Sequence, residues 1–423
     1  MNKEFYPASG TVLYQGVTGS GLPVCVFPKE EFQTRYAFFA VRYGGCDRRF
    51  LLDGNWLDTP AGIAHFLEHK MFDMPGYNAL EKLTAMGASP NAFTSHGMTG
   101  YLFSCTDGFY ENLEELLRFV MTPCFSPESV EKEQGIIGQE IRMGEDSPAR
   151  RVQQNLLRAL YSEHPARDSI AGTVESIAQI SADTLYDCHR MFYHPGNMVL
   201  CCAGDMDAEK VLELADRVVT TPAGETALRD YGREESLLPN QVRIEDKMSV
   251  SMPLFRLGAK LPREAEGGDW ARSMLVASLA CELLLGEGTP LYNAMYQDGV
   301  INKSFYAGAF DFPGGGVCCA GGRCADPGAV LGRIVDGAEA FRMDRAAEKR
   351  LSGLKKKALG DFLMALDSLD DLCHSQADGY LSGWQHMDFP GICGEISGEE
   401  VERFLHETLQ AQRLAISVVS PGS

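Results

Sequence analysis

The chain is short of positive charge. Its 423 residues include 38 Lys and Arg against 58 Asp and Glu, which leaves a formal net charge of −20. Such an excess of negative charge argues against nucleic acid or an anionic membrane surface as the main partner. Apolar residues at 45 % and charged residues at 23 % are the proportions of globular proteins, and they exclude a largely disordered chain.

Long hydrophobic runs are missing as well. The most apolar stretch, residues 274–285, contains Ser278 and Glu282 and is too short and too polar to span a bilayer. The first residues do not combine a basic segment with an apolar one, so no secretory signal is expected. The 13 cysteines include no Cys-x-x-Cys motif, which favours free thiols in a reducing compartment. We therefore expect a cytoplasmic protein.

The order of predicted elements occurs twice along the chain. The first series has strands at 22–27 and 35–43, helices at 60–72 and 77–86, a hairpin at 91–95 and 98–105, helices up to 192, and a strand at 197–203. The second has a strand at 252–260, a helix at 270–285, strands at 304–312 and 316–323, helices over 327–372, and a strand at 414–419.

This repetition predicts an α+β fold of two similar domains, each a mostly antiparallel sheet backed by helices. The first domain would cover residues 1–220 and the second residues 248–423. The charged, proline-containing stretch 221–247 is interpreted as the linker between them.

A histidine pair lies in the predicted helix 60–72, for which Thr59 is the expected N-cap and Pro60 the first helical residue. His65 and His69 share one helix face, with β-carbons about 5–6 Å apart, and two imidazoles so placed can bind one zinc ion. Glu68 lies on the same face and could take a proton from a water at the metal. The alternative is an exposed or salt-bridged helix face.

A third ligand is needed, because a hydrolytic zinc site has three protein ligands and one open position. In the predicted helix that follows Ser126, Glu133 and Glu140 are two turns apart and share a stripe with Ile137. Carboxylates on an apolar stripe are costly unless something positive meets them, and a zinc ion would meet them. The alternative is that both acids are solvated surface residues.

Together these motifs resemble the pitrilysin/insulinase family of zinc metallopeptidases, whose His-x-x-Glu-His order defines the inverzincins. The family pattern continues with two glutamates separated by six residues, of which the second is a ligand. Here 70 residues separate His69 from Glu140, and six separate Glu133 from Glu140. The resemblance implies a zinc endopeptidase with one zinc per chain on His65, His69 and Glu140. Glu68 matches the general base, and Glu133 matches an accessory acid.

The same resemblance implies a substrate-binding strand and a partner. Asn91 and Ala92 match an edge strand that pairs with the backbone of short or unfolded peptides, by β-augmentation. The chain would form half of a clam-like peptidase chamber, so a second unit is expected to complete it.

The second half of the chain departs from the family pattern. Many relatives carry there an Arg and, seven residues on, a Tyr, which contact the substrate; here Tyr296 and Lys303 occupy these places. We therefore expect the metal-bearing subunit of a dimer, whose partner is a metal-free paralogue that supplies both groups, or a second copy of the chain. A non-catalytic structural or processing-complex subunit is the alternative function, although the metal motif is intact.

Overall fold

The computed structural model describes residues 1–7, 9–263 and 266–422, and its contacts separate into two compact units. Unit 1 comprises Met1–Ile141, Ser169–Asp230 and Phe362–Asp388, and unit 2 comprises Arg142–Asp168, Tyr231–Asp361 and Phe389–Ser423. Each unit has its own hydrophobic core. Each also includes one segment from the other half of the sequence, an exchange that the contiguous boundaries predicted at 1–220 and 248–423 did not anticipate.

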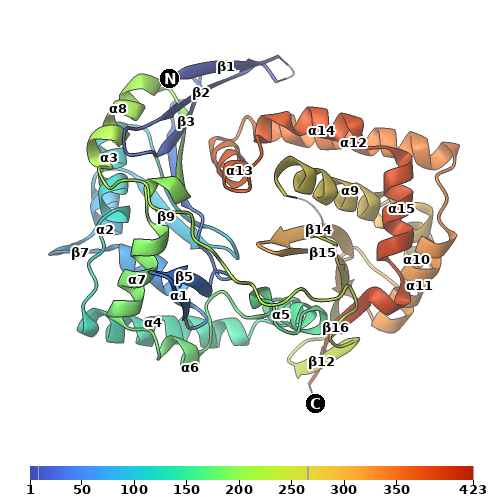
Figure 1. The fold of residues 1–423 in the computed structure, drawn as a ribbon. Coiled ribbons are helices and arrows are strands. Elements are labelled where there is room, and N and C mark those ends of the chain that lie inside the picture. The colour runs from blue at the N-terminus through green and yellow to red at the C-terminus, as the bar shows by residue number, and fades with distance from the viewer. Residues whose placement is uncertain (8, 264–265, 423) are drawn as a thin grey trace. The chain divides into compact units, whose positions relative to one another are not determined.

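Unit 1 contains a seven-stranded sheet in the order β1-β2-β3-β11-β4-β10-β9 (Figure 1). Neighbouring strands are antiparallel, except β3 and β11, which are parallel. The strands are β1 (Asn2–Tyr6), β2 (Thr11–Val17), β3 (Pro23–Pro28), β4 (Arg35–Val41), β9 (Ser89–Thr94), β10 (Thr99–Cys105) and β11 (Met198–Gly204). The strands predicted in this half are confirmed, whereas β1 and β2 were not predicted.

Helices cover both faces of this sheet. They are α1 (Ile63–Met71), α2 (Ala79–Ala85), α3 (Phe109–Val120), most of α4 (Pro127–Glu145), α6 (Val174–Ile177), α7 (Ala182–Phe192), α8 (Ala208–Val218) and α13 (Leu369–Leu381). Figure 1 shows α13 on the face opposite to α3 and α8, where it contacts β4 and β11. Cover on both faces explains why β4 and β11 are continuous apolar runs without alternation.

Unit 2 contains a five-stranded sheet in the order β12-β16-β13-β15-β14. Only β12 and β16 are parallel neighbours. The strands are β12 (Arg243–Met248), β13 (Leu254–Lys260), β14 (Tyr306–Phe312), β15 (Gly315–Arg323) and β16 (Leu414–Pro421). The strands predicted in the second half are confirmed, and β12 begins inside the stretch that was interpreted as a linker.

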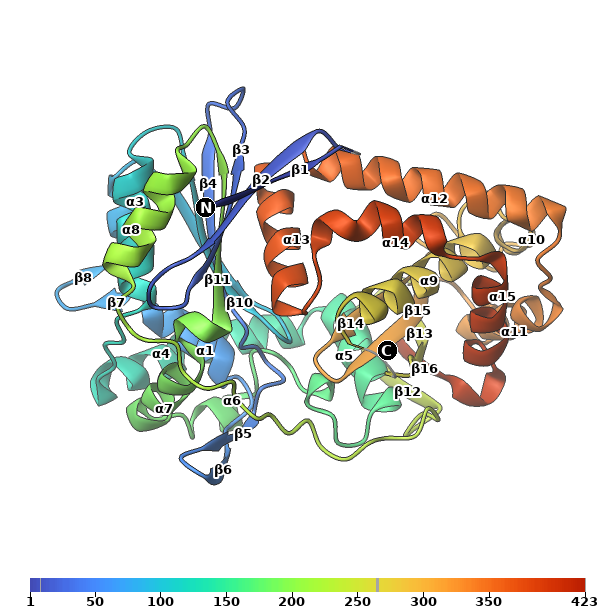
Figure 2. The ribbon, with the colours of Figure 1, turned by 45° about the horizontal axis from the view of Figure 1, so that its top comes forward.

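The helices of unit 2 also lie on both faces of its sheet. They are α5 (Pro148–Leu160), α9 (Gly267–Leu285), α10 (Pro290–Gln297), α11 (Pro327–Ala340), most of α12 (Arg345–Ala365), α14 (Phe389–Glu395) and α15 (Gly398–Thr408). One face is covered by α5, which contacts β13 and β16, and the other by α9, which contacts β14 and β15 (Figure 2).

The two units follow one plan. In each, a helix (α1 or α9) precedes the hairpin at the sheet edge (β9–β10 or β14–β15). A long helix (α4 or α12) then leads into a helix (α5 or α13) that packs on the sheet built from the other half of the sequence. In each sheet the strand that comes last in the sequence (β11 or β16) pairs in parallel with one neighbour and antiparallel with the other. These parallels confirm the predicted α+β fold of two similar domains.

Shorter elements complete the chain. They are the ribbons β5 (Arg49–Leu52) with β6 (Asn55–Asp58) and β7 (Asp73–Met74) with β8 (Tyr77–Asn78), and the 3₁₀ turns η1 (Pro165–Arg167), η2 (Pro195–Asn197), η3 (His386–Asp388) and η4 (Ala411–Arg413). No single helix among the described residues is long and apolar enough to cross a membrane; α9 and α10 meet that criterion only together, as a bent pair.

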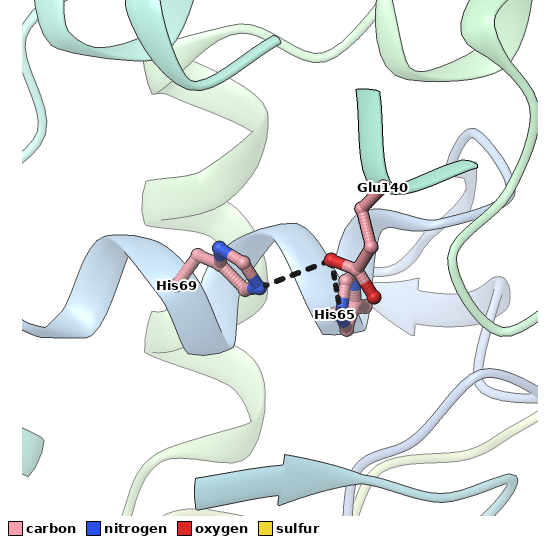
Figure 3. A group of neighbouring side chains, drawn as sticks. All are labelled: His65, His69 and Glu140. Atoms are coloured by element: carbon pink, nitrogen blue, oxygen red, sulfur yellow. Dashed lines mark ion pairs between the residues drawn. The ribbon is translucent and has the colours of Figure 1, made fainter. Parts of the chain in front are cut away.

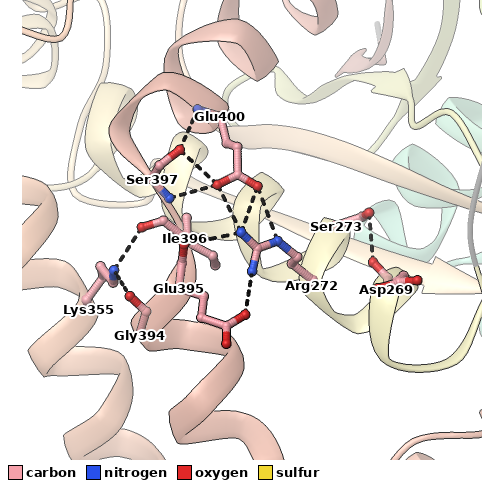
Figure 4. A network of polar contacts seen from close by, with 9 residues as sticks. All are labelled: Asp269, Arg272, Ser273, Lys355, Gly394, Glu395, Ile396, Ser397 and Glu400. Atoms are coloured by element: carbon pink, nitrogen blue, oxygen red, sulfur yellow. Dashed lines mark hydrogen bonds and ion pairs between the residues drawn. The ribbon is translucent and has the colours of Figure 1, made fainter.

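Polar side chains tie the helices of unit 2 to each other (Figure 4). Arg272 on α9 donates to both carboxylate oxygens of Glu400 on α15, at 2.9 and 3.0 Å, and pairs with Glu395 on α14. Glu400 also accepts from the backbone and hydroxyl of Ser397, the N-cap of α15. Because a fork-shaped guanidinium bonds a carboxylate at two points, this network fixes the orientation of α15 against α9.

Candidate metal centre

The helix with the His-x-x-Glu-His motif begins at Ile63, three residues later than predicted. Its N-cap is Gly62, whose φ of 95° lies in the left-handed region and where a Cβ would come within 2.6 Å of the carbonyl oxygen of Ala171. Thr59, the predicted N-cap, instead donates its hydroxyl to the carbonyl of Arg48 at 2.8 Å. The prediction of the helix start was therefore wrong, because a glycine that tolerates positive φ and close approach sets it.

The two histidines lie on the side of α1 that is turned away from the core. The opposite side packs into the core of unit 1 through Ile63, Phe66, Leu67 and Met71. The side chains of His65 and His69 remain 12 % and 28 % exposed, with ring centroids 4.6 Å apart. Residues four apart on one helix face are neighbours, as the sequence predicted.

Glu140 on α4 meets both histidines (Figure 3). Its Oε2 lies 3.7 Å from Nε2 of His65 and 3.8 Å from Nε2 of His69, and one ligand atom from each residue lies within 4.8 Å of the others. Two ligands that are each about 2.0–2.2 Å from a tetrahedral zinc are about 3.3–3.6 Å apart. Two imidazoles and a carboxylate also form a donor set that zinc accepts in hydrolytic sites, so the residues present fit this ion.

Glu133 forms a hydrogen bond with the ring nitrogen of His69 that is not directed at Glu140. Its Oε1 accepts from Nδ1 of His69 at 3.0 Å, which leaves Nε2 directed at Glu140. Burial lowers the pKa of His69, but the bond to Glu133 and the nearby carboxylates outweigh it, so that the pKa is raised above its ordinary value. A metal ion at this position therefore competes with a proton.

Glu68 is buried beside the histidines, and a threonine donates a hydrogen bond to it. The Oε2 atom accepts from the hydroxyl of Thr94 on β9 at 2.7 Å. The pKa of Glu68 is raised, chiefly by burial, although the bond from Thr94 and the charge of His69 act in the opposite direction. A carboxylate with a raised pKa suits general-base catalysis near neutral pH.

The predicted substrate strand lies beside this cluster. β9 contacts α1 and is an edge strand of the sheet, where among the described residues it pairs with β10 alone. Asn91 is exposed on β9 and its Oδ1 accepts from the backbone N–H of Ala92 at 2.9 Å. In the described sheet, the backbone groups on the outer edge of β9 can therefore pair with an added strand.

Sequence reasoning brought together the histidines, Glu140 and Glu133, but it missed Thr94. A signal was present, since Thr94 follows Ala92 by two residues and alternation places both on the same face of a strand. In unit 2, Tyr296 is exposed on α10 and stacks on Tyr292, and Lys303 is exposed in the loop before β14. That neither residue replaces the missing Arg and Tyr stays a prediction.

Comparison with known proteins supports one family over the whole chain. The family description "Insulinase (Peptidase family M16)" matches residues 54–174, and "Peptidase M16 inactive domain" matches residues 179–356. The uncharacterized zinc protease YmfH of Bacillus subtilis is 35 % identical over 425 residues, which cover 97 % of this chain and 97 % of the relative. The chain therefore belongs to the insulinase family, peptidase family M16, as a single two-domain unit.

Solved structures agree with this assignment. An M16-like peptidase from Alicyclobacillus acidocaldarius superposes with a TM-score of 0.91 at 32 % identity, covering 97 % of this chain and 99 % of that chain. The periplasmic protease PqqL from Escherichia coli shares the fold, with a TM-score of 0.75 at 17 % identity. That match covers 100 % of this chain but only 48 % of PqqL, so PqqL is about twice as long.

Proposed function

We propose that this chain is a zinc-dependent endopeptidase that hydrolyses short or unfolded peptides. The observation that carries the proposal is the convergence of His65, His69 and Glu140 from two helices, with Glu140 Oε2 within 3.8 Å of both imidazoles. Relatives that are named zinc proteases support the choice of metal and of reaction class. One zinc per chain is proposed, since the described residues contain one such cluster.

Each side chain in the cluster has a role in this proposal. His65, His69 and Glu140 would hold the ion, which when bound supplies a Lewis acid for the scissile carbonyl and for the attacking water. Glu68 takes the proton from that water and passes it to the leaving amine. Glu133 keeps His69 in the tautomer and orientation that direct Nε2 into the site.

Peptide binding is assigned to the edge of β9. Asn91 and Ala92 offer their backbone groups there, beside the helix that carries Glu68. A peptide that adds as a strand is held by main-chain hydrogen bonds, which demand little of its sequence. Short or unfolded peptides can bind in this way, whereas a folded protein has its backbone groups already paired.

We further propose that the chain acts as the metal-bearing subunit of a dimer that encloses its substrate. PqqL shares the fold in a single chain that is about twice as long as this one. Tyr296 and Lys303 do not supply the Arg and Tyr expected from the second half, so a metal-free paralogue is the proposed partner and a second copy of this chain the other option. The cytoplasm is the proposed location, where the 13 free cysteines would stay reduced.

Metal analysis together with a peptidase assay tests the proposal. The purified chain, alone and with candidate paralogues, is assayed with an unstructured fluorogenic peptide, and its zinc is measured by elemental analysis. We expect one zinc per chain, and hydrolysis that a chelator abolishes and zinc restores. Zinc binding without hydrolysis in any pairing would instead favour a non-catalytic subunit, and a chain that binds no zinc would refute the metal site.

A further inference from the structure

The carboxylate of Glu68 has one hydrogen-bond donor among the described residues, and it comes from a different element. Thr94 Oγ1 donates to Glu68 Oε2 at 2.7 Å, which links the last residue of β9 to the middle of α1. Glu68 is only 7 % exposed, so its side chain has little freedom to turn. A buried carboxylate with a single fixed donor has its orientation set by that donor.

Thr94 is itself held rigidly. Its backbone lies in register with Thr99 in the β9–β10 hairpin. A β-branched side chain in a strand has few χ1 rotamers, so the hydroxyl has little freedom to turn away. The donor is therefore placed by the sheet, while the carboxylate is placed by α1.

We propose that Thr94 is a positioning residue for the proton transfer, because its hydroxyl occupies Oε2 and leaves Oε1 of Glu68 as the oxygen that accepts the proton of the attacking water. The inference rests on the proposed function. The proton moves from the water to Oε1 and then to the leaving amine, while the hydroxyl of Thr94 keeps its own proton throughout. Thr94 touches neither the substrate nor the predicted metal ligands in this account.

The hairpin also contains a matched control. Thr99 faces Thr94 across the two strands, but its hydroxyl donates to the backbone carbonyl of Tyr43 at 2.8 Å. Thr99→Val removes a hydroxyl from the same hairpin without touching Glu68. A general effect of losing a threonine hydroxyl in this sheet should appear in both variants.

The test compares Thr94→Val, Thr94→Ser and Thr99→Val in the zinc-loaded protein, with its partner if activity requires one. For Thr94→Val we expect kcat to fall about 10- to 100-fold, the loss typical of a displaced reacting group, with KM and zinc content unchanged. Thr94→Ser keeps the donor and should restore kcat, and Thr99→Val should retain it. An unchanged kcat in Thr94→Val, a serine variant as slow as the valine variant, or a loss of zinc would overturn the proposal.

Crystal structures of the wild type and of Thr94→Val add a result that does not depend on turnover. We expect the carboxylate of Glu68 to rotate or to adopt two conformers in the variant. A carboxylate that stays in place would overturn the positioning role. If the wild type hydrolyses no peptide, the proposed function fails, and the crystal structures still decide whether Thr94 orients Glu68.

Discussion

In unit 1 the helices α1 and α4 meet through His65, His69 and Glu140, whereas in unit 2 the corresponding helices α9 and α12 meet through Glu282 and Lys357. The contact between two such helices is called a joint below, and the joint in unit 2 is an ion pair of one acid and one base. The joint in unit 1 brings a carboxylate and two imidazoles together, and these three groups could bind a cation. The same arrangement of helices thus holds a group of residues that could bind a metal ion in one unit and a simple salt bridge in the other.

The contact between helix and edge strand differs in the same way. Glu68 on α1 accepts from Thr94 on β9, whereas Cys281 on α9 donates to the backbone carbonyl of Gly308 on β14 at 3.6 Å. Around Cys281, α9 is apolar and buried in the core of unit 2. Cys281 lies within residues 179–356, which match a domain described as inactive. The two units therefore differ in a few side chains where helix meets helix and where helix meets edge strand.

Glu68→Gln should produce the largest effect. Glutamine keeps the shape but cannot accept a proton, so we expect peptide hydrolysis to fall by about 10³-fold or more. Zinc content should not change, because Glu68 is not among the predicted ligands. Turnover and elemental analysis of one preparation check both expectations, and a variant that stays active would refute the role of Glu68 as the base.

His65→Ala and Glu140→Ala should each remove the metal. Each leaves two of the three predicted ligands, so stoichiometric zinc should be lost together with hydrolysis. The measurement is zinc per chain after dialysis, with circular dichroism as the check on folding. Retention of a full equivalent of zinc in either variant would show that the metal lies elsewhere.

Glu133→Ala should weaken zinc binding without abolishing it. The loss of a carboxylate that orients a ligating histidine typically costs about 10- to 100-fold in metal affinity. Competition with a chelator measures the change. Glu131→Ala, an exposed site on the same helix, removes the same charge and serves as the control. Equal losses in both variants would point to a general electrostatic effect.

Glu235 in unit 2 should make stability depend on acid pH. Burial opposes ionisation, but the backbone N–H groups of Ser162, Glu163 and His164 bond the carboxylate and lower its pKa from 4.5 to about 2. A folded-state pKa below the unfolded value means that the stabilisation is complete above pH 4.5 and is lost as the pH falls through 2.

Glu235→Gln should therefore lower the free energy of unfolding by about 2 kcal/mol at neutral pH, from the loss of charge-assisted hydrogen bonds. The difference from the wild type should shrink as the pH falls below 4.5. Denaturant unfolding at several pH values measures it, and Glu234→Gln at an exposed neighbour is the control. A difference that does not vary with pH would exclude this account.

Lys357→Ala should have the smallest effect and sharpens the comparison of the joints. Lys357 and Glu282 are 56 % and 38 % exposed, and exposed ion pairs contribute about 0–1 kcal/mol. We expect a small change in the midpoint of thermal unfolding and none in zinc content. A loss of zinc on breaking this pair would mean that the joint in unit 2 also supports the metal.

The parts of the fold that could be predicted are those with a local signal. β4 and β11 are apolar runs without alternation. The spacing of four residues between His65 and His69 places both on one helix face. The start of α1 could not be read in this way, because Gly62 is required by the approach of a distant backbone segment. Thr94 was missed because its hydrogen bond crosses from a strand to a helix.

The exchange of helices between the two halves of the sequence could not be predicted either. An amphipathic pattern shows that a helix has an apolar face, but it does not say which sheet that face covers. α5 and α13 each follow a long helix directly, and each packs on the sheet built from the other half of the sequence. The short strand β1 was missed for a simpler reason, since most of its residues are polar or exposed.

The exchange also bears on how the chain is synthesised. The segment Phe362–Asp388 supplies α13, the helix that covers one face of β4 and β11, so the N-terminal sheet lacks that cover until residue 388 has left the ribosome. Unit 1 can therefore complete its folding only after nearly all of the chain has been translated, although most of its strands are synthesised early. A gene cut between the two halves would yield fragments that need each other's helix to become stable.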